Sequence, residues 1–169
     1  MTLHQFFTDD HHRIDGILEK ATEKAGEINL DLYYQFRAQL LRHIKMEEKI
    51  LFPAAKKANP IIAEQIIPRY RLEHGAITAL MVPPPTALLV KVIRYLVDVH
   101  DLAEEQPGGL YEICEELTQG QTEELLNQLK ATDEVPLHLP NPAPIAMQSA
   151  IRALRRAGYD YDEIVRKVQ

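Results

Sequence analysis

Hydrophobic residues recur along this chain at the spacing of amphipathic helices, every three or four positions. Four long segments show this spacing, at about residues 2–26, 30–57, 61–81 and 86–106. Gly26, the pair Asn59-Pro60 and the prolines at 83–85 stand between them, and such residues end helices or form turns. No segment alternates apolar and polar residues with the period of a strand. The pattern therefore predicts an all-α protein.

The remaining chain is expected to add shorter helices, at residues 110–118, 121–131, 145–157 and 160–168. Before the last two, residues 136–144 contain four of the chain's 11 prolines, which predicts an extended linker. We therefore expect an up-down four-helix bundle with short additional C-terminal helices. Its predicted divisions are a bundle domain, a proline-rich linker and a helical addition, at residues 1–131, 132–144 and 145–169.

A histidine and a glutamate interrupt the apolar face of the second predicted helix. His43 and Glu47 are four residues apart, one helical turn, and they share a stripe with Phe36, Leu40 and Ile44. A carboxylate on a buried face costs several kcal/mol unless a cation compensates its charge. Because an imidazole lies one turn away, a metal ion is the most suitable cation.

The other three bundle helices repeat this feature. His100 and Glu104 recur at the same spacing on the fourth helix, while His74 and His11 lie on the apolar faces of the third and first. A single histidine of this kind is commonly an ordinary core residue. A core network of four histidines and two glutamates, however, would need every member hydrogen-bonded without leftover charge. The pattern favours a metal site made by His11, His43, Glu47, His74, His100 and Glu104.

The number and type of these donors indicate the kind of site. Six donors exceed the four that close a structural zinc site. Two carboxylates can instead bridge two ions, with two imidazoles completing each ion, which predicts a dinuclear centre with open positions for a small ligand. Mixed imidazole and carboxylate donors suit iron, manganese or zinc better than calcium or magnesium.

Neighbouring polar residues leave alternatives open. His12 is adjacent to His11 and is expected to face outward, and it is the alternative ligand on the first helix. Glu48 and Glu73 fall off the apolar stripes, so we expect them at the surface or orienting a histidine N–H. On this basis Glu48→Ala should be nearly silent. Tyr70, one turn before a histidine, can reach the site but is more simply a core residue.

Composition and charge argue against other classes of protein. A net charge of −6 disfavours nucleic acid and anionic membranes as partners, and the most apolar run, residues 87–99, contains three charged residues. The single cysteine cannot form an internal disulfide and fits a reducing compartment. The start MTLHQFFTDD lacks the features of a secretory signal. We therefore expect a cytoplasmic protein.

Four sequence elements carry a resemblance to a known family. They are Asp10-His11, HIKMEEKILFP at 43–53, LEHGAI at 72–77 and HDLAEE at 100–105. Over about residues 1–118 the chain resembles the hemerythrin-like (HHE cation-binding) family, in which a four-helix bundle holds a non-haem di-iron centre. The resemblance implies two iron ions with an oxo or hydroxo bridge, for which zinc or manganese can substitute. It implies as ligands the same six residues, with Glu47 and Glu104 as bridges.

The chain also departs from the family pattern. Thr78 occupies the position at which oxygen-carrying hemerythrins have a further histidine. The remaining set of four histidines and two glutamates is similar to the repair-of-iron-centres di-iron proteins, but the cysteine-bearing domain of those proteins has no counterpart here. The segment Gln106-Pro107-Gly108-Gly109 lengthens the chain after the fourth helix and leaves Glu105 as an alternative to Glu104.

Several functions are compatible with such a centre. The leading hypothesis is a protein that binds or senses O₂, NO or a related oxidant such as peroxide, because imidazole-rich ligation favours ligand binding over the stabilisation of high-valent oxidants. The alternatives are iron handling or repair of iron–sulfur centres, and a weak peroxide-consuming or oxidase activity. No general acid–base group is evident, so an enzyme is the less favoured hypothesis. The segment 145–168 can dock on the bundle or join two copies as a homodimer.

Overall fold

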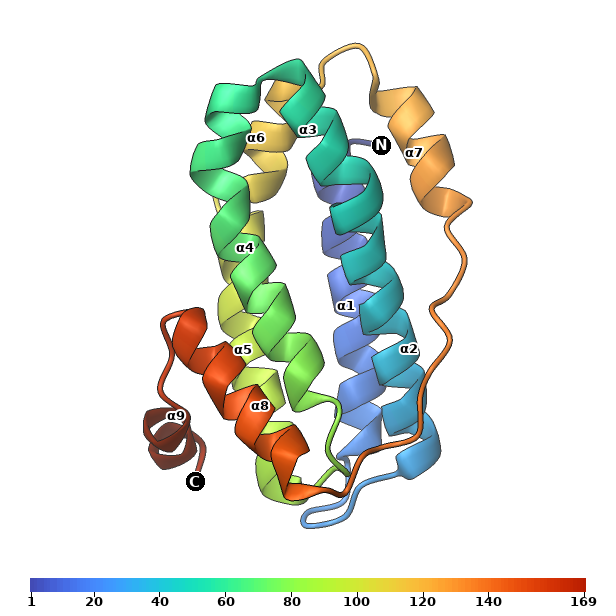
Figure 1. The fold of residues 1–169 in the computed structure, drawn as a ribbon. Coiled ribbons are helices and arrows are strands. Elements are labelled where there is room, and N and C mark those ends of the chain that lie inside the picture. Colours follow the sequence, from blue (N-terminus) through green and yellow to red (C-terminus); the bar gives the residue numbers. More distant parts are fainter.

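Four long antiparallel helices form the body of the protein. The computed structural model describes residues 1–169, which form helices and connecting segments without a strand. The bundle consists of α1 (Leu3–Ala21), α2 (Leu30–Met46), α4 (Pro60–Leu80) and α5 (Ala87–Glu105), and the chain alternates in direction from each to the next (Figure 1). The predicted all-α bundle with additional helices is therefore confirmed. No helix is long and apolar enough to cross a membrane.

Side chains just before each long helix begin it. Thr2, Asn29, Asn59 and Thr86 each accept a hydrogen bond from a backbone N–H of the first helical turn. Those N–H groups have no partner within the helix, and a cap of this kind stabilises a helix by about 1 kcal/mol. The helix starts are therefore local properties of the sequence, and they agree with the predicted ones within two residues.

The second predicted helix is continuous but contains a wider turn that begins at Glu47. After α2 follows the π-helix η1 (Glu47–Leu51), and then α3 (Phe52–Ala58). The N–H of Phe52 bonds to the carbonyl of Glu47, five residues back. Pro53 comes next and, because it lacks an N–H and its ring collides with the carbonyl four residues earlier, an ordinary turn is disfavoured there. Pro53 thus widens the helix and does not end it.

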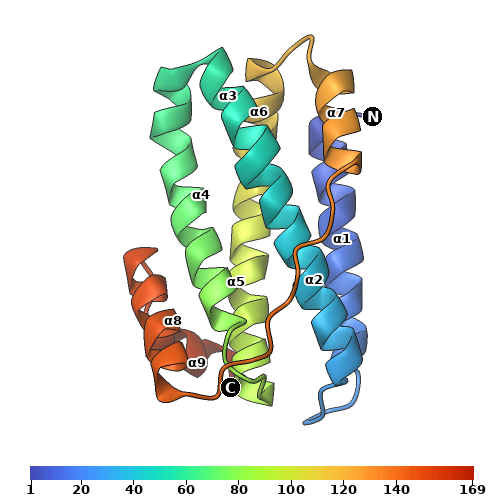
Figure 2. The ribbon, with the colours of Figure 1, turned by 45° about the vertical axis from the view of Figure 1, so that its right-hand side comes forward.

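The C-terminal part of the chain folds back on the bundle. The helices α6 (Leu110–Leu117) and α7 (Thr122–Lys130) lie at the end of the bundle that carries the N-terminus (Figure 1). The proline-rich segment then runs along α2, where Arg42 and Arg37 donate hydrogen bonds to the carbonyls of Thr132 and His138 (Figure 2). Finally α8 (Pro144–Arg156) packs against α4, and α9 (Tyr161–Val168) packs against α5.

These last helices share the core of the bundle. Ala150, Leu154 and Ile164 belong to the same apolar cluster as Leu18 and Ile93. The division of the chain at residues 131 and 144, and a homodimer through the last helices, stay predictions. In this structure the apolar faces of α8 and α9 lie against their own bundle.

Two apolar clusters fill the bundle, with a polar layer between them. One contains Ile14, Ile44 and Ile77, and the other contains Phe7, Leu51 and Tyr70 among their members. The histidines and glutamates singled out from the sequence fall between these positions on their helices. The polar layer is therefore sealed from water by hydrocarbon on both sides.

Candidate metal centre

The polar layer contains all six residues that the sequence singled out. His11, His43, His74 and His100 are 2 to 4% exposed, and Glu47 and Glu104 are fully buried. Their side chains come from α1, α2, η1, α4 and α5 and converge on the axis of the bundle. Burying this many polar groups is expensive unless they bind one another or a cation.

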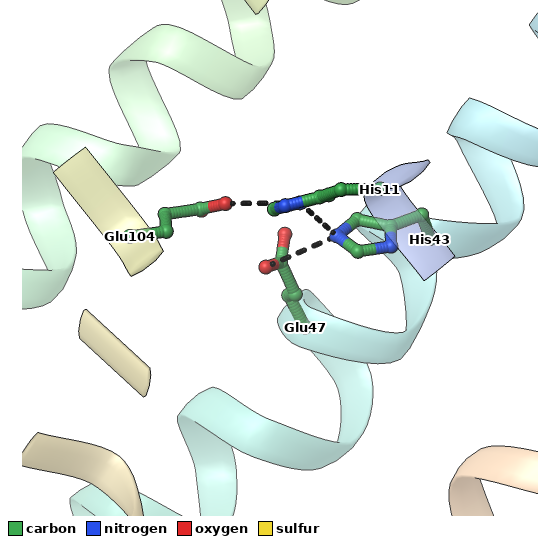
Figure 3. Close-up of side chains that lie close together, drawn as sticks. All are labelled: His11, His43, Glu47 and Glu104. Atoms are coloured by element: carbon green, nitrogen blue, oxygen red, sulfur yellow. Dashed lines mark hydrogen bonds and ion pairs between the residues drawn. The ribbon is translucent and has the colours of Figure 1, made fainter. Parts of the chain in front are cut away.

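The six side chains form two overlapping groups. His11, His43, Glu47 and Glu104 offer one atom each, all within 4.8 Å of one another, and Glu47, His74, His100 and Glu104 do the same (Figure 3 shows the first group). The two glutamates are common to both groups.

Each shared carboxylate directs one oxygen to each group. Oε1 of Glu47 lies 3.4 Å from Nε2 of His43, and Oε2 lies 2.9 Å from Nε2 of His74. Oε2 of Glu104 lies 3.4 Å from Nε2 of His11, and its Oε1 lies 2.9 Å from Nε2 of His100. This is how a carboxylate that bridges two cations distributes its oxygens.

Three buried atoms of the second group have no hydrogen-bond partner: Oε2 of Glu47, Nε2 of His74 and Oε1 of Glu104. Although Nε2 of His74 is only 2.9 Å from Oε2 of Glu47, the two atoms do not meet in hydrogen-bond geometry. Buried polar atoms without a partner cost about 1–3 kcal/mol each. Atoms that converge without bonding one another, on imidazole and carboxylate groups, fit a transition-metal cation.

A carboxylate holds the outer nitrogen of every histidine in the layer. Nδ1 of His11 lies 2.6 Å from Glu105, and Nδ1 of His43 lies 2.8 Å from Asp10. On the other side, Nδ1 of His74 lies 2.8 Å from Glu48, and that of His100 lies 2.6 Å from Glu73. A proton on each Nδ1 leaves the lone pair of Nε2 directed inward. Carboxylates of this kind orient metal-binding histidines and increase their basicity.

The wide turn of η1 allows two consecutive glutamates to serve the same histidine. Oε2 of Glu47 faces Nε2 of His74, and Oε1 of Glu48 binds Nδ1 of the same ring. Glu48 also accepts a hydrogen bond from Arg71 across 3.0 Å. Wide turns inside helices are frequent at functional sites.

Charges of opposite sign stabilise one another in the layer. Burial alone would lower the pKa of His100, but Glu104 and Glu73 raise that pKa to about 10. The pKa of His43 is raised to about 9, because Glu47 and Asp10 outweigh burial and the neighbouring His11. Conversely, burial raises the pKa of Glu47, yet His43 and His74 hold it well below its ordinary value. Without metal, protons on the histidines thus supply the positive charge that a cation can replace.

A helical bundle with a buried cluster of histidines and glutamates defines a cation-binding helical protein. The model of the family "Hemerythrin HHE cation binding domain" matches residues 2–82 of the chain. The resemblance recognised from the motifs is thereby confirmed. Searches of curated proteins and of solved structures gave no match.

The structure places the residues that the sequence left open. His12 is exposed, whereas His11 lies in the layer. Glu104 lies in the layer, and Glu105 binds Nδ1 of His11 from outside it. Tyr70 is a core residue whose hydroxyl donates to the carbonyl of Ala103. The role of the six residues as ligands stays a prediction.

Two residues of the site were missed. Asp10 precedes His11 in the sequence but serves His43 on the next helix, which no periodicity within α1 could indicate. Tyr111 lies in α6, beyond the Pro107-Gly108-Gly109 break, and its hydroxyl lies in the centre of the layer. A helical pattern does not extend across such a break, so no signal in the sequence pointed to it.

Proposed function

We propose that this protein holds two iron ions in a non-haem di-iron centre and binds or senses O₂, NO or a related oxidant such as peroxide. The observation that carries the proposal is the division of each shared carboxylate between two pairs of histidines. One pair is His11 and His43, and the other is His74 and His100. Glu47 and Glu104 would be the bridges.

The donor set supports iron. Four imidazoles and two carboxylates suit iron, with manganese and zinc as substitutes that the same donors accept. Bound iron would supply redox-active, Lewis-acidic positions to which a small oxidant can coordinate. The chain's own contribution is to hold the imidazole rings in place through the Nδ1 carboxylates and to exclude water with the two apolar clusters.

The burial of the layer supports a small ligand. None of the six residues is more than 4% exposed, and the main surface pockets are lined by other residues. A diatomic molecule or peroxide can enter through small fluctuations of packed side chains, whereas a larger substrate would need the bundle to open. The single buried cysteine agrees with a cytoplasmic location, which is part of the same proposal.

The test is metal analysis of protein purified without chelator, followed by reconstitution of the metal-free protein with ferrous iron under nitrogen. The expected result is two irons per chain, near-UV absorption of a bridged di-ferric pair after oxidation, and a spectral change when NO is added to the ferrous protein. Glu47→Ala should lose both irons, and His12→Ala, at an exposed neighbour of the layer, should retain them.

Three outcomes would count against this function. Protein that takes up no iron, or only one ion per chain, would remove the di-iron centre. Protein that binds two irons, ignores O₂ and NO, and passes its iron to an apo iron–sulfur acceptor would instead support iron handling. Steady peroxide turnover that disappears in Glu47→Ala would support the catalytic alternative.

A further inference from the structure

Tyr111 reaches the centre of the layer because of an unusually close turn. Glu105 ends α5, and α6 begins only five residues later, at Leu110. A Cβ at position 109 would lie 2.6 Å from the carbonyl oxygen of Ala103 and 2.7 Å from that of Glu104, so only glycine allows this approach. The turn brings α6 back beside α5 and α1, and the side chain of Tyr111 is fully buried between them.

The hydroxyl oxygen of Tyr111 lies among all four donors of the first group. It is 2.6 Å from Oε1 of Glu47 and 2.9 Å from Oε2 of Glu104. It is also 3.1 Å from Nε2 of His11 and 3.2 Å from Nε2 of His43.

Hydrogen bonds account for only part of this arrangement. A phenol has one proton, so it can donate to Glu47 or to Glu104 but not to both. The second contact then brings a carboxylate oxygen against a phenol lone pair in a buried place, which is repulsive. A cation shared by these oxygens would remove the repulsion.

The spacing of the five atoms matches the donors around one cation. Neighbouring donors at right angles around an ion with bonds of about 2.1 Å are about 3 Å apart. Nε2 of His11 and Nε2 of His43 are 2.9 Å apart, and each lies 3.4 Å from its carboxylate neighbour, Glu104 or Glu47. The hydroxyl oxygen caps these four atoms at 2.6 to 3.2 Å. A metal can therefore lie among the five donors without displacing Tyr111.

Only the first donor group has a tyrosine hydroxyl beside it. All three unpartnered atoms of the layer belong to the second group, which contains His74 and His100 and no phenol. The ring of Tyr111 is also held in place, because it stacks on Phe7 with centroids 4.8 Å apart.

We propose that Tyr111 is a fifth protein ligand of the cation held by His11, His43, Glu47 and Glu104. On binding, the phenol O–H bond breaks, an O–metal bond forms and the proton leaves to solvent. The two positions are then unequal: the first has a hard anionic oxygen that favours ferric iron, as tyrosinate does in haem enzymes. The second, with His74 and His100, has fewer protein donors and is the position at which a small ligand binds. This inference rests on the di-iron function proposed above.

The test compares the ferric protein with two variants, Tyr111→Phe and Tyr70→Phe. Tyr70 is a matched control because it is also buried, and its hydroxyl donates to the backbone of Ala103 and not to the donor groups. Wild type and Tyr70→Phe are expected to show a visible phenolate-to-iron charge-transfer band with tyrosinate modes in the resonance Raman spectrum. Tyr111→Phe is expected to lose both signals while the iron of the second position stays bound.

The outcomes separate this inference from the function on which it rests. Wild-type protein that binds two ferric ions without the visible band or the tyrosinate modes would overturn the role of Tyr111 and leave the di-iron function intact. Protein that binds no iron would overturn both. Because the wild-type spectrum decides the question, the test does not depend on the folding of Tyr111→Phe.

Discussion

The hydroxyl of Tyr159 lies 3.3 Å from Oε1 of Glu73, the residue whose Oε2 binds Nδ1 of His100 at 2.6 Å. Tyr159 lies in the turn between α8 and α9, so the C-terminal part of the chain contacts one of the carboxylates that hold the histidine Nδ1 atoms. Arg69 binds the same oxygen of Glu73 at 3.1 Å. The end of the chain therefore contributes to the shell that orients one predicted ligand.

Tyr159→Phe removes this contact and keeps the ring. We expect the free energy of unfolding to fall by about 1 kcal/mol, which is the usual net contribution of one hydrogen bond. The loss is no larger because the carboxylate of Glu73 keeps its hydrogen bond from Arg69. Metal affinity should fall by no more than a few-fold, because Arg69 still holds Glu73. Urea unfolding and chelator competition measure the two effects. An unchanged protein would show that the C-terminal helices do not support the site.

Glu47→Ala should reduce metal binding more than Glu48→Ala does. Loss of Glu47 removes a carboxylate common to both donor groups, so metal content should drop to near zero. Glu48→Ala should weaken metal binding by about 10–100-fold, the usual effect of losing a carboxylate that orients a ligating histidine. This replaces the sequence-based expectation that Glu48→Ala is nearly silent. Chelator titration distinguishes the cases, and equal metal content in both variants would contradict the assignment.

His11→Ala and His12→Ala test which face of α1 points into the bundle. His11 is buried in the layer and His12 is exposed, so only the first substitution should reduce metal content. Both variants should remain helical by circular dichroism. A loss of metal in His12→Ala with normal content in His11→Ala would show that α1 is rotated relative to this structure.

The metal-free protein should be less stable in alkaline solution. Folding raises the pKa of His43 to about 9 and that of His100 to about 10, from the ordinary value of 6.5. The resulting stabilisation is fully present below about pH 6.5 and is lost as the pH rises through 9 to 10. Urea unfolding of chelator-treated protein between pH 7 and 10 measures it. His100→Gln should flatten this dependence, whereas His12→Gln should leave it unchanged.

Gly109→Ala should destabilise the turn before α6. A Cβ there would collide with backbone oxygens of α5, at a cost of about 1–3 kcal/mol. Gly75, exposed in the middle of α4 with nothing within 4 Å of its Cβ position, is the control. Gly75→Ala should stabilise the protein by about 0.5–1 kcal/mol. Thermal melts of the metal-free variants separate the two, and equal melting temperatures would contradict the strained approach at position 109.

The helices and their inward faces were determined by the sequence itself. Helix caps and helical spacing are relations between residues only a few positions apart, so they can be read from the amino-acid sequence directly. Examples are the caps Asn29 and Thr86 and the spacing of His43 and Glu47. Because the same spacing also selects which side chains are buried, His74 was correctly placed in the interior.

The pairing of groups from different helices was decided by the tertiary structure alone. Asp10 meets His43, and Tyr111 meets Glu47, across gaps of tens of residues in the sequence. Such contacts depend on the rotation and offset of packed helices and on one close glycine turn, and helical periodicity carries no information on either. Helical periodicity was enough to predict six donors that point inward. It could not predict the approach of the Tyr111 phenol, because that contact exists only in the folded bundle.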